Sequence, residues 1–366
     1  MYLALYRKFR PKTFNEVIGQ EHITSTLINQ VKTGQIGHAY LFTGSRGTGK
    51  TSCAKIFAKA INCLNSSDGS PCGKCEVCKS LEDPSNIDIL EIDAASNNGV
   101  NEIRELREKI KYPPINAKYK VYIIDEVHML TDSAFNALLK TLEEPPKHAV
   151  FILATTEVYK LPATILSRCM RFDFRLVDTS LLINHLKNVF NSIGVTYDEA
   201  SLQAIAVAGE GSVRDTLSIA DCVLAFSGEN ITINNTLEIL GASDKQIVSS
   251  LADKIINKDL GGVLETINDI YSSGKNLISV GKEITIHFKN LLVIKSCSNF
   301  EKMLNVSKET LQALENQANK TTIEDLLFYM QKFSGIEAEL KYALSPKTLI
   351  ELTALECASL NNEKKN

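Results

Sequence analysis

The chain has 366 residues, with 40 basic and 43 acidic side chains and a formal net charge of -3. This balance excludes a uniformly basic nucleic-acid-binding protein, so any contact with DNA must come from a local patch. No apolar run approaches the roughly 20 residues of a membrane span, so we expect a cytoplasmic protein with no membrane partner. A chain of this length is expected to form two or three domains.

Short apolar runs predict strands at residues 39–43, 87–92, 121–125, 149–154 and about 170–174, with helix-like segments between them. This alternation is typical of a parallel α/β sheet. After Phe174 the strand signals nearly vanish, and apolar residues recur at helical spacing in residues 180–193, 199–208 and 212–226. A polar interruption at residues 230–235 and a new helix cap near residue 242 indicate a further boundary, followed by a helical bundle.

A phosphate-binding pattern, GxxxxGK[ST], follows the first predicted strand and opens a predicted helix. It comprises Gly44, Ser45, Arg46, Gly47, Thr48, Gly49, Lys50 and Thr51, with Ser52 next. Glycines let the backbone curl so that successive N–H groups and the positive helix end face the phosphates. Lys50 would reach the β and γ phosphates, and the Thr51 hydroxyl would hold Mg²⁺. The sequence therefore predicts a nucleoside triphosphate site rather than a simple glycine-rich turn.

Four cysteines cluster in a polar stretch at about residues 62–80. Cys63, Cys72, Cys75 and Cys78 have the spacing C-x₈-C-x₂-C-x₂-C. Such a loop has little core of its own, so four thiolates on Zn²⁺ would supply its folding energy. An iron–sulfur cluster and free thiols are the alternatives, although a ferredoxin-like pattern places its fourth cysteine downstream, before a proline. The five cysteines outside this cluster are interpreted as small buried hydrophobic residues: Cys53, Cys169, Cys222, Cys297 and Cys357.

Two carboxylates, Asp125 and Glu126, follow a buried strand at the end where parallel sheets bind their ligands. Asp125 is placed to hold Mg²⁺ through water, and Glu126 to orient and activate the attacking water. His128 is at least as well explained by a core or helix-start position as by a catalytic role. The next strand ends in Thr155 and Thr156, whose hydroxyls could sense the γ phosphate or the attacking water.

Two arginines could stabilise charge on the transferred phosphoryl group. Arg168 lies at a predicted helix end, and Arg214 lies just inside a helix of the second domain. Surface arginines are common, so neither position identifies a catalytic role without further context.

Taken together, these motifs resemble the AAA+ ATPases, and within them the tau/gamma subunits of the bacterial DNA polymerase III clamp loader. The resemblance covers about residues 2–242 and is carried by YRKFRP at 6–11, FNEVIGQEH at 14–22, residues 38–52, IDEVHML at 124–130, FNALLKTLEEPP at 135–146, residues 153–156, residues 166–169 and residues 211–215. It implies an ATP-binding domain at residues 1–177, a helical lid at 178–242 and a helical oligomerisation collar at 243–366 that ends in a frayed tail.

The resemblance also implies roles for individual residues. Thr155 or Thr156 would be sensor 1, Arg168 an arginine finger reaching a neighbouring subunit's ATP, and Arg214 sensor 2. The adenine pocket would be lined by the segment 6–11, which includes Tyr6, Arg10 and Pro11, together with Val17 and Ile18. The implied cofactors are ATP, Mg²⁺ and Zn²⁺.

The implied partners are delta-type and delta-prime-type loader subunits in a hetero-oligomeric ring, the sliding clamp and primed DNA. Polymerase and helicase contacts are expected only in a longer form, because the chain stops soon after the expected collar. At the DNA-facing helix, Asn97 stands where family members often have arginine, so Asn98, Gly99 and Arg104 would share that contact. The polymerase label of the family, EC 2.7.7.7, describes the holoenzyme, and we expect no DNA synthesis by this chain.

The main prediction is thus an ATP-driven clamp-loader subunit. A DNA translocase or branch-migration motor of the same superfamily is the alternative, but it would need a DNA-binding domain after the lid, and the C-terminal third lacks winged-helix strands and basic runs. A non-hydrolysing structural subunit is a third hypothesis. The intact Gly49, Lys50, Thr51, Asp125 and Glu126 argue against it.

Overall fold

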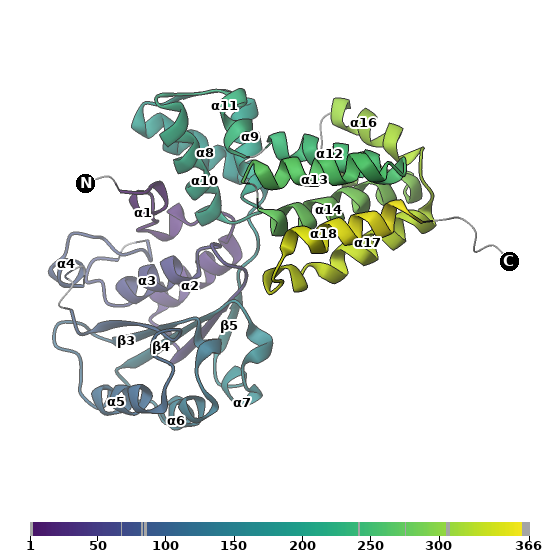
Figure 1. Cartoon of the computed structure of the whole chain (residues 1–366). Helices are drawn as coiled ribbons and strands as arrows, with labels where there is room; N and C mark the ends of the chain where they lie inside the picture. The colour runs from purple at the N-terminus through teal and green to yellow at the C-terminus, as the bar shows by residue number, and fades with distance from the viewer. Residues whose placement is uncertain are drawn as a thin grey trace. The chain divides into compact units, whose positions relative to one another are not determined.

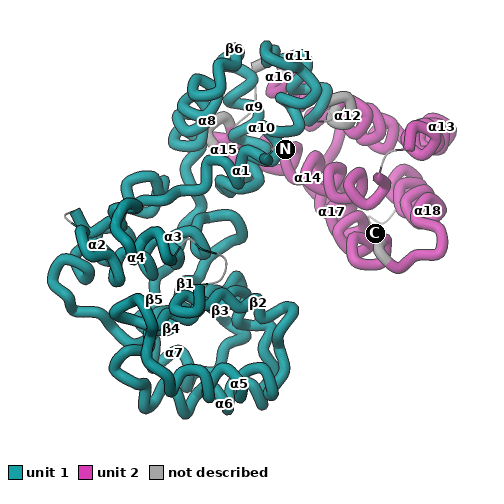
Figure 2. The backbone as a smooth tube through the Cα atoms, turned by 90° about the vertical axis from the view of Figure 1, so that its left-hand side faces the viewer, with its two compact units in different colours: residues 1–240 teal, residues 241–366 magenta. Residues whose placement is uncertain are grey.

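The computed structural model describes residues 3–66, 68–81, 83, 86–240, 242–274, 276–304 and 308–360. It forms two compact units, residues 1–240 and 241–366, which Figure 2 colours separately. The predicted frayed tail at residues 361–366 lies outside the described residues, as does residue 67 of the predicted zinc module. Among the described residues, no helix is both long and apolar enough to cross a membrane.

The first unit is built on a five-stranded parallel sheet in the order β2-β3-β4-β1-β5. The strands are β1 (Ala39–Thr43), β2 (Ile89–Asp93), β3 (Lys120–Asp125), β4 (Ala149–Thr155) and β5 (Met170–Asp173). The three central strands are buried on both faces, which explains their continuous apolar runs. The five predicted strands and the parallel α/β class are therefore confirmed.

Helices cover both faces of this sheet (Figure 1). The helical elements of this part are α1 (Leu5–Lys8), η1 (Phe14–Glu16), α2 (Glu21–Thr33), α3 (Lys50–Ala60), α4 (Glu76–Ser80), α5 (Val100–Ile110), η2 (Val127–Met129), α6 (Asp132–Glu143), η3 (Val158–Lys160) and α7 (Ala163–Leu166). Alternate strand residues enter two cores: Tyr40 and Phe42 pack with α2 and α3, and Leu41 packs with α5, α6 and α7. The carboxyl ends of the strands remain available for a ligand.

A small helical part completes the first unit. It contains α8 (Thr179–Ile193), α9 (Glu199–Ala208), α10 (Val213–Ser227) and α11 (Ile233–Ile239), and a two-stranded parallel sheet of β6 (Thr196–Tyr197) and β7 (Asn230–Ile231). The sequence predicts a polar interruption at residues 230–235, whereas the structure has the two-residue strand β7 at its start. Leu5 of α1 belongs to the core of this helical part, and its N–H donates to Asp221 Oδ2 at 3.0 Å. The N-terminal segment is thereby attached to the lid helix α10.

The described elements of the second unit are helices. They are α12 (Ala242–Ile256), α13 (Leu260–Ser272), α14 (Leu277–Ser296), α15 (Phe300–Met303), α16 (Lys308–Ala318), α17 (Ile323–Ile336), η4 (Glu339–Lys341) and α18 (Pro346–Ala358). Phe288 of α14 packs against Tyr329 and Phe333 of α17 in the centre of one continuous apolar core. This core makes the unit a helical bundle.

Candidate active site

The phosphate-binding loop connects β1 to α3, and it depends on glycines with positive φ. Gly44, Gly47 and Gly49 have φ values of 142°, 75° and 103°. A Cβ at Gly44 would lie 2.3 Å from the Phe174 carbonyl oxygen, so only glycine fits between the loop and β5's end. The loop leads directly into the first turn of α3, whose free N–H groups favour an anion.

Lys50 lies inside this loop. Its ammonium donates to the carbonyl oxygens of Gly44 and Ser45 at 2.7 and 2.9 Å. Burial lowers the pKa of Lys50, and the nearby Glu126 and Asp125 oppose that shift. The loop thus holds a cation where a phosphate would bring compensating negative charge.

Thr51 and Asp125 are the residues predicted to hold a magnesium ion. The Thr51 hydroxyl, at the start of α3, donates to Asp125 Oδ2 at the end of β3, over 2.7 Å. A hydroxyl and a carboxylate brought this close are oxygen ligands of the type that Mg²⁺ takes beside a nucleotide. These residues therefore fit a magnesium ion bound with a triphosphate.

Glu126 follows Asp125 in the left-handed region, with φ of 46°. This unusual conformation turns its side chain toward β4 rather than continuing the strand. Its Oε2 accepts from the Thr156 N–H at 3.3 Å and from the Thr156 hydroxyl at 3.1 Å. The Glu126 carboxylate, which is predicted to orient the attacking water, is thereby attached to the end of the neighbouring strand.

The two candidate sensor threonines have different environments. Thr155 is fully buried, and its hydroxyl contacts His128 Nδ1 and accepts from the Glu157 N–H, both at 3.0 Å. His128 Nε2 in turn lies 3.2 Å from Glu157 Oε2. His128 is thus a partnered, largely buried residue, and Thr156 is the threonine in contact with Glu126.

A cleft of about 620 Å³ brings most of the predicted nucleotide-binding residues together. Its walls contain the predicted residues Tyr6, Arg10, Pro11, Val17, Ile18, Arg46, Gly47, Thr48, Gly49, Lys50, Thr51, Ser52, Asp125, Glu126 and Arg214. Gly44, Ser45, Thr155, Thr156 and Arg168 are not among its lining residues. Arg10 Nε donates to Ser52 Oγ at 3.1 Å, which links the N-terminal segment to α3.

Arg7 and Phe9, which belong to the segment 6–11 predicted to line the adenine pocket, also line the cleft. Sequence reasoning missed four other lining residues: Glu16, His185, Val213 and Leu217. His185 of α8 is notable because its Nε2 is buried without a hydrogen-bond partner in the described part of the chain. Burial also lowers the pKa of His185, which favours the neutral ring. A lone histidine on a lid helix gives no signal in the sequence that could have placed it in this cleft.

The lid approaches the phosphate loop directly through α10. The Arg214 N–H donates to the Gly47 carbonyl oxygen at 3.4 Å, and the Arg214 guanidinium lies 5.2 Å from the centre of the Tyr6 ring. The distance to Tyr6 is that of a cation–π interaction. Arg214 therefore lies in the wall of the cleft, with its backbone against the glycine-rich loop and its guanidinium against the N-terminal segment.

Gly47→Ala is expected to weaken ATP binding by at least about tenfold, because an added Cβ would lie 2.0 Å from Ser212 Oγ and would force α10 away from the loop. Titration with a fluorescent ATP analogue measures this loss. Gly34→Ala is a matched control, since Gly34 also has a positive φ, of 71°, but has no neighbour within 4 Å of an added Cβ. Equal losses in the two variants would show that the lid contact is unimportant.

Arg168 lies apart from this cleft, after the end of α7. Its Nη2 donates to Glu143 Oε1 at 2.6 Å, and its side chain is 32% exposed. It is therefore accessible to another molecule rather than directed into the site of its own chain.

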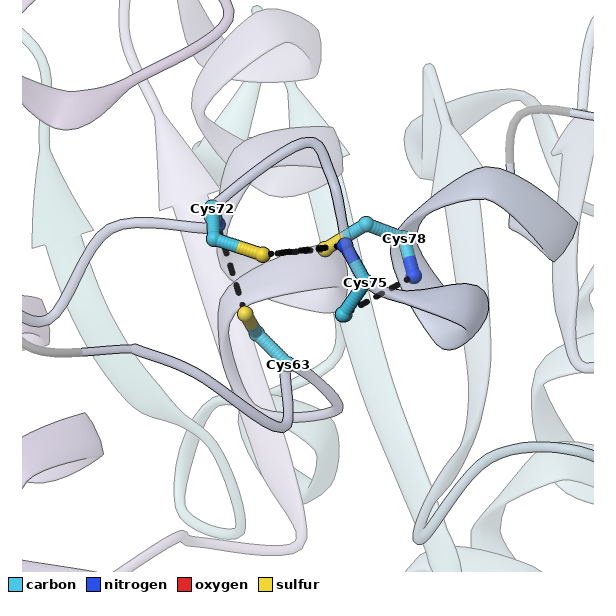
Figure 3. A group of neighbouring side chains, drawn as sticks. All are labelled: Cys63, Cys72, Cys75 and Cys78. Carbon is cyan, nitrogen blue, oxygen red and sulfur yellow. Dashed lines mark hydrogen bonds between the residues drawn. The ribbon is translucent and has the colours of Figure 1, made fainter.

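The four clustered cysteines converge on one point (Figure 3). Their Sγ atoms lie within 4.8 Å of one another, and Cys72 Sγ is 3.9 Å from Cys78 Sγ. Tetrahedral ligation with Zn–S bonds of about 2.3 Å places the sulfurs roughly 3.8 Å apart, so the four thiols fit a zinc ion. No disulfide links them.

Backbone N–H groups also point at these sulfurs, as is common around metal-bound thiolates. Cys72 Sγ accepts from the N–H groups of Lys74 and Cys75 at 3.4 and 3.3 Å, and these bonds lower the pKa of Cys72 to about 6. Cys63 Sγ accepts from the Cys72 N–H at 3.3 Å, and Cys75 Sγ from the Cys78 N–H at 3.4 Å.

The interpretation of the five remaining cysteines was wrong for Cys222, which lies exposed on α10. Cys53 and Cys357 are buried, and Cys169 and Cys297 are partly exposed. The apolar neighbours of Cys222 in the sequence lie on other faces of the same helix, so composition alone was misleading.

The residues predicted to approach DNA lie between β2 and α5. Gly99 is the N-cap of α5, and Arg104 is exposed on that helix. Asn97 donates from its side chain to the Asp93 carbonyl oxygen at 3.0 Å, and the Asn98 carbonyl oxygen accepts from Thr131 at 3.2 Å. These hydrogen bonds connect the segment before α5 to the end of β2 and to the start of α6.

The parallel sheet, glycine loop, paired carboxylates and helical lid define a P-loop ATPase of the AAA+ type. Family models match three successive segments: "DNA polymerase III, delta subunit" at residues 19–178, "DNA polymerase III clamp loader subunit, ATPase lid domain" at 182–229, and "DNA polymerase III subunits gamma and tau domain III" at 231–365.

Curated relatives agree with these matches. The chain is 42% identical to the Bacillus subtilis DNA polymerase III subunit tau, covering 99% of this chain and 64% of that protein. It is 37% identical to the Mycobacterium tuberculosis subunit gamma/tau, covering 98% of this chain and 62% of that protein. It is also 37% identical to the Buchnera aphidicola subunit gamma, covering 98% of this chain and 99% of that protein. The chain belongs to the DNA polymerase III gamma/tau family.

Proposed function

We propose that this chain is the ATP-binding and ATP-hydrolysing motor subunit of a DNA polymerase III clamp loader, which loads the sliding clamp onto primed DNA during replication. The observation that carries the proposal is the complete hydrolytic set in one cleft: Lys50, Thr51, Asp125 and Glu126 line it together with Arg214 from the lid. A subunit with only a structural role would not need all five residues.

Each residue has a defined task in this proposal. Lys50 exchanges its carbonyl partners for phosphate oxygens, and Thr51 and Asp125 hold Mg²⁺, which when bound neutralises charge on the phosphates. Glu126 accepts a hydrogen bond from the attacking water and orients it for in-line attack. Arg214 binds phosphate charge as sensor 2 and connects nucleotide binding to lid position.

Thr156 is the better candidate for sensor 1. Its hydroxyl already contacts Glu126, whereas the Thr155 hydroxyl is occupied by His128 and Glu157. A threonine that contacts the Glu126 carboxylate can also bind the γ phosphate, and it would thereby couple the position of the carboxylate to the presence of that phosphate. In this proposal Thr155 has a structural role and stabilises the end of β4 through its contacts with His128 and Glu157.

Arg168 is proposed to act in trans, as an arginine finger on the ATP of a neighbouring subunit. Its absence from the cleft of its own chain supports this role, and so does its partial exposure. The partners would be delta-type and delta-prime-type subunits in a ring, with the clamp and primed DNA. Asn98, Gly99 and Arg104 are the proposed DNA contacts.

The proposed domains are an ATP-binding domain at residues 1–177, a lid at 178–242 and an oligomerisation collar at 243–366. The chain spans 64% and 62% of the length of the Bacillus and Mycobacterium relatives. We propose no DNA synthesis by this chain itself, and a cytoplasmic location.

The cysteine cluster is proposed to bind one structural Zn²⁺, which would replace a missing apolar core in the polar insertion. We expect Cys72→Ser to lose the metal and to make the insertion sensitive to protease. Metal released by thiol modification is quantified with a chromogenic chelator. Cys222→Ser, which removes an exposed thiol outside the cluster, should retain the metal. Equal metal content in both variants would contradict a four-cysteine zinc site.

Steady-state ATPase activity tests the proposed function. The chain is mixed with partner loader subunits, and clamp and primed DNA are added separately and together. The proposal predicts strong stimulation only when both are present. Hydrolysis by the chain alone on duplex DNA, with no response to the clamp, would instead support the translocase alternative.

A further inference from the structure

The Arg168 guanidinium is held in place by groups of its own chain. Nη1 donates to the Thr164 carbonyl oxygen of α7 at 2.7 Å and to Ser167 Oγ at 3.3 Å. Nη2 donates to Oε1 of Glu143, the last residue of α6, at 2.6 Å. The arginine is thus fixed between two helices rather than extended freely into solvent.

These contacts occupy only part of the guanidinium. Arginine has five N–H donors in a rigid plane, and the contacts named above all use Nη1 and Nη2. Arg168 Nε has no partner in the described part of the chain. This edge of the plane remains able to donate to a phosphate oxygen while the other edge stays attached to α6 and α7.

We propose that Glu143 is a positioning residue, which holds Arg168 in the orientation that reaches the ATP of the neighbouring subunit. The inference rests on the proposed arginine-finger function of Arg168. An unrestrained arginine loses much rotamer freedom each time it engages a phosphate. A carboxylate that already fixes the arginine side chain reduces this entropy cost. The guanidinium then has the required orientation before the subunits meet, so less rotamer freedom is lost on reaching the transition state.

The contact is too exposed to serve mainly as a source of stability. Glu143 is 47% exposed and Arg168 32% exposed, and an ion pair in water contributes little to folding. The ion pair therefore serves mainly to orient the Arg168 side chain. Loss of Glu143 should lower the rate of ATP turnover without changing the free energy of unfolding. The adjacent Glu144 is also exposed and makes no side-chain hydrogen bond or ion pair in the described part of the chain, so it is a matched control.

The test measures kcat and KM for ATP in the assembled loader with clamp and primed DNA. Glu143→Gln keeps the size of the side chain but removes its charge, and we expect kcat to fall by about tenfold with KM and the thermal unfolding midpoint unchanged. Glu144→Gln should match wild type. Adding Glu143→Gln to Arg168→Ala should cause no further loss, because the group that Glu143 positions is already gone.

Unchanged or increased kcat in Glu143→Gln would overturn the proposal, and an increase would mean that Glu143 restrains Arg168 in an inactive position. A further loss in the double variant would also overturn it, because Glu143 would then act on another group. If Arg168→Ala itself retains full stimulation, the finger assignment fails, and this result is distinct from failure of the positioning role alone.

Discussion

Glu126→Gln is expected to stop ATP turnover while ATP still binds. Glutamine has the shape of glutamate and can still accept from Thr156, so the strand ends should remain in place. It lacks the charge that we propose orients the attacking water, and loss of such a group costs on the order of 10²- to 10⁴-fold in rate. Phosphate release measures turnover, and titration with a fluorescent ATP analogue measures affinity, which should change by less than about twofold.

Glu157→Gln provides the control for this experiment. Glu157 contacts His128 nearby but is not among the residues that line the cleft, so its carboxylate should be dispensable for hydrolysis. If Glu126→Gln retained wild-type turnover, another residue would have to orient the water. If it lost ATP binding instead, Glu126 would act in ground-state binding rather than in the chemical step.

Arg168→Ala is expected to remove most of the clamp- and DNA-stimulated hydrolysis of the assembled loader, on the order of 10³-fold at each site that it serves, because an arginine finger stabilises charge that develops in the transition state. ATP affinity of the isolated chain should not change, since Arg168 does not line the cleft of its own chain. Single-turnover hydrolysis in the assembled loader separates this chemical step from clamp release.

Arg171→Ala tests whether the loss is specific to the finger. Arg171 is also an exposed arginine, located on β5 and paired with Asp173 at 2.8 Å. The Arg171→Ala variant should retain the clamp- and DNA-stimulated ATP hydrolysis of wild type. If Arg168→Ala weakened ATP binding by the isolated chain, the residue would be acting in cis, contrary to the proposal.

The sheet was predictable because its central strands are buried on both faces and so appear as continuous apolar runs. Tyr40 and Leu41, which are adjacent in β1, enter different cores, and both must be apolar. The strand order could not be predicted from these runs, since they carry no information on which strands pair. β6 and β7 were missed because strands of two residues have no detectable period.

The candidate site was predictable where its chemistry depends on local spacing, as in the phosphate loop and in Asp125 and Glu126. It was not predictable where partners come from distant elements. Which threonine contacts Glu126 depends on how β3 lies beside β4. Likewise, Glu143 and Arg168 are 25 residues apart and meet only because α6 and α7 pack on the same face.

The most direct test of the central claim is the amount of sliding clamp that remains on a primed circular DNA after gel filtration. The reaction contains the chain, its partner loader subunits, clamp and ATP, and it is repeated with Lys50→Ala. We predict ATP-dependent retention of the clamp with wild type and none above background with Lys50→Ala. Equal retention with the variant, or no retention with wild type, would contradict an ATP-driven clamp-loading role for this chain.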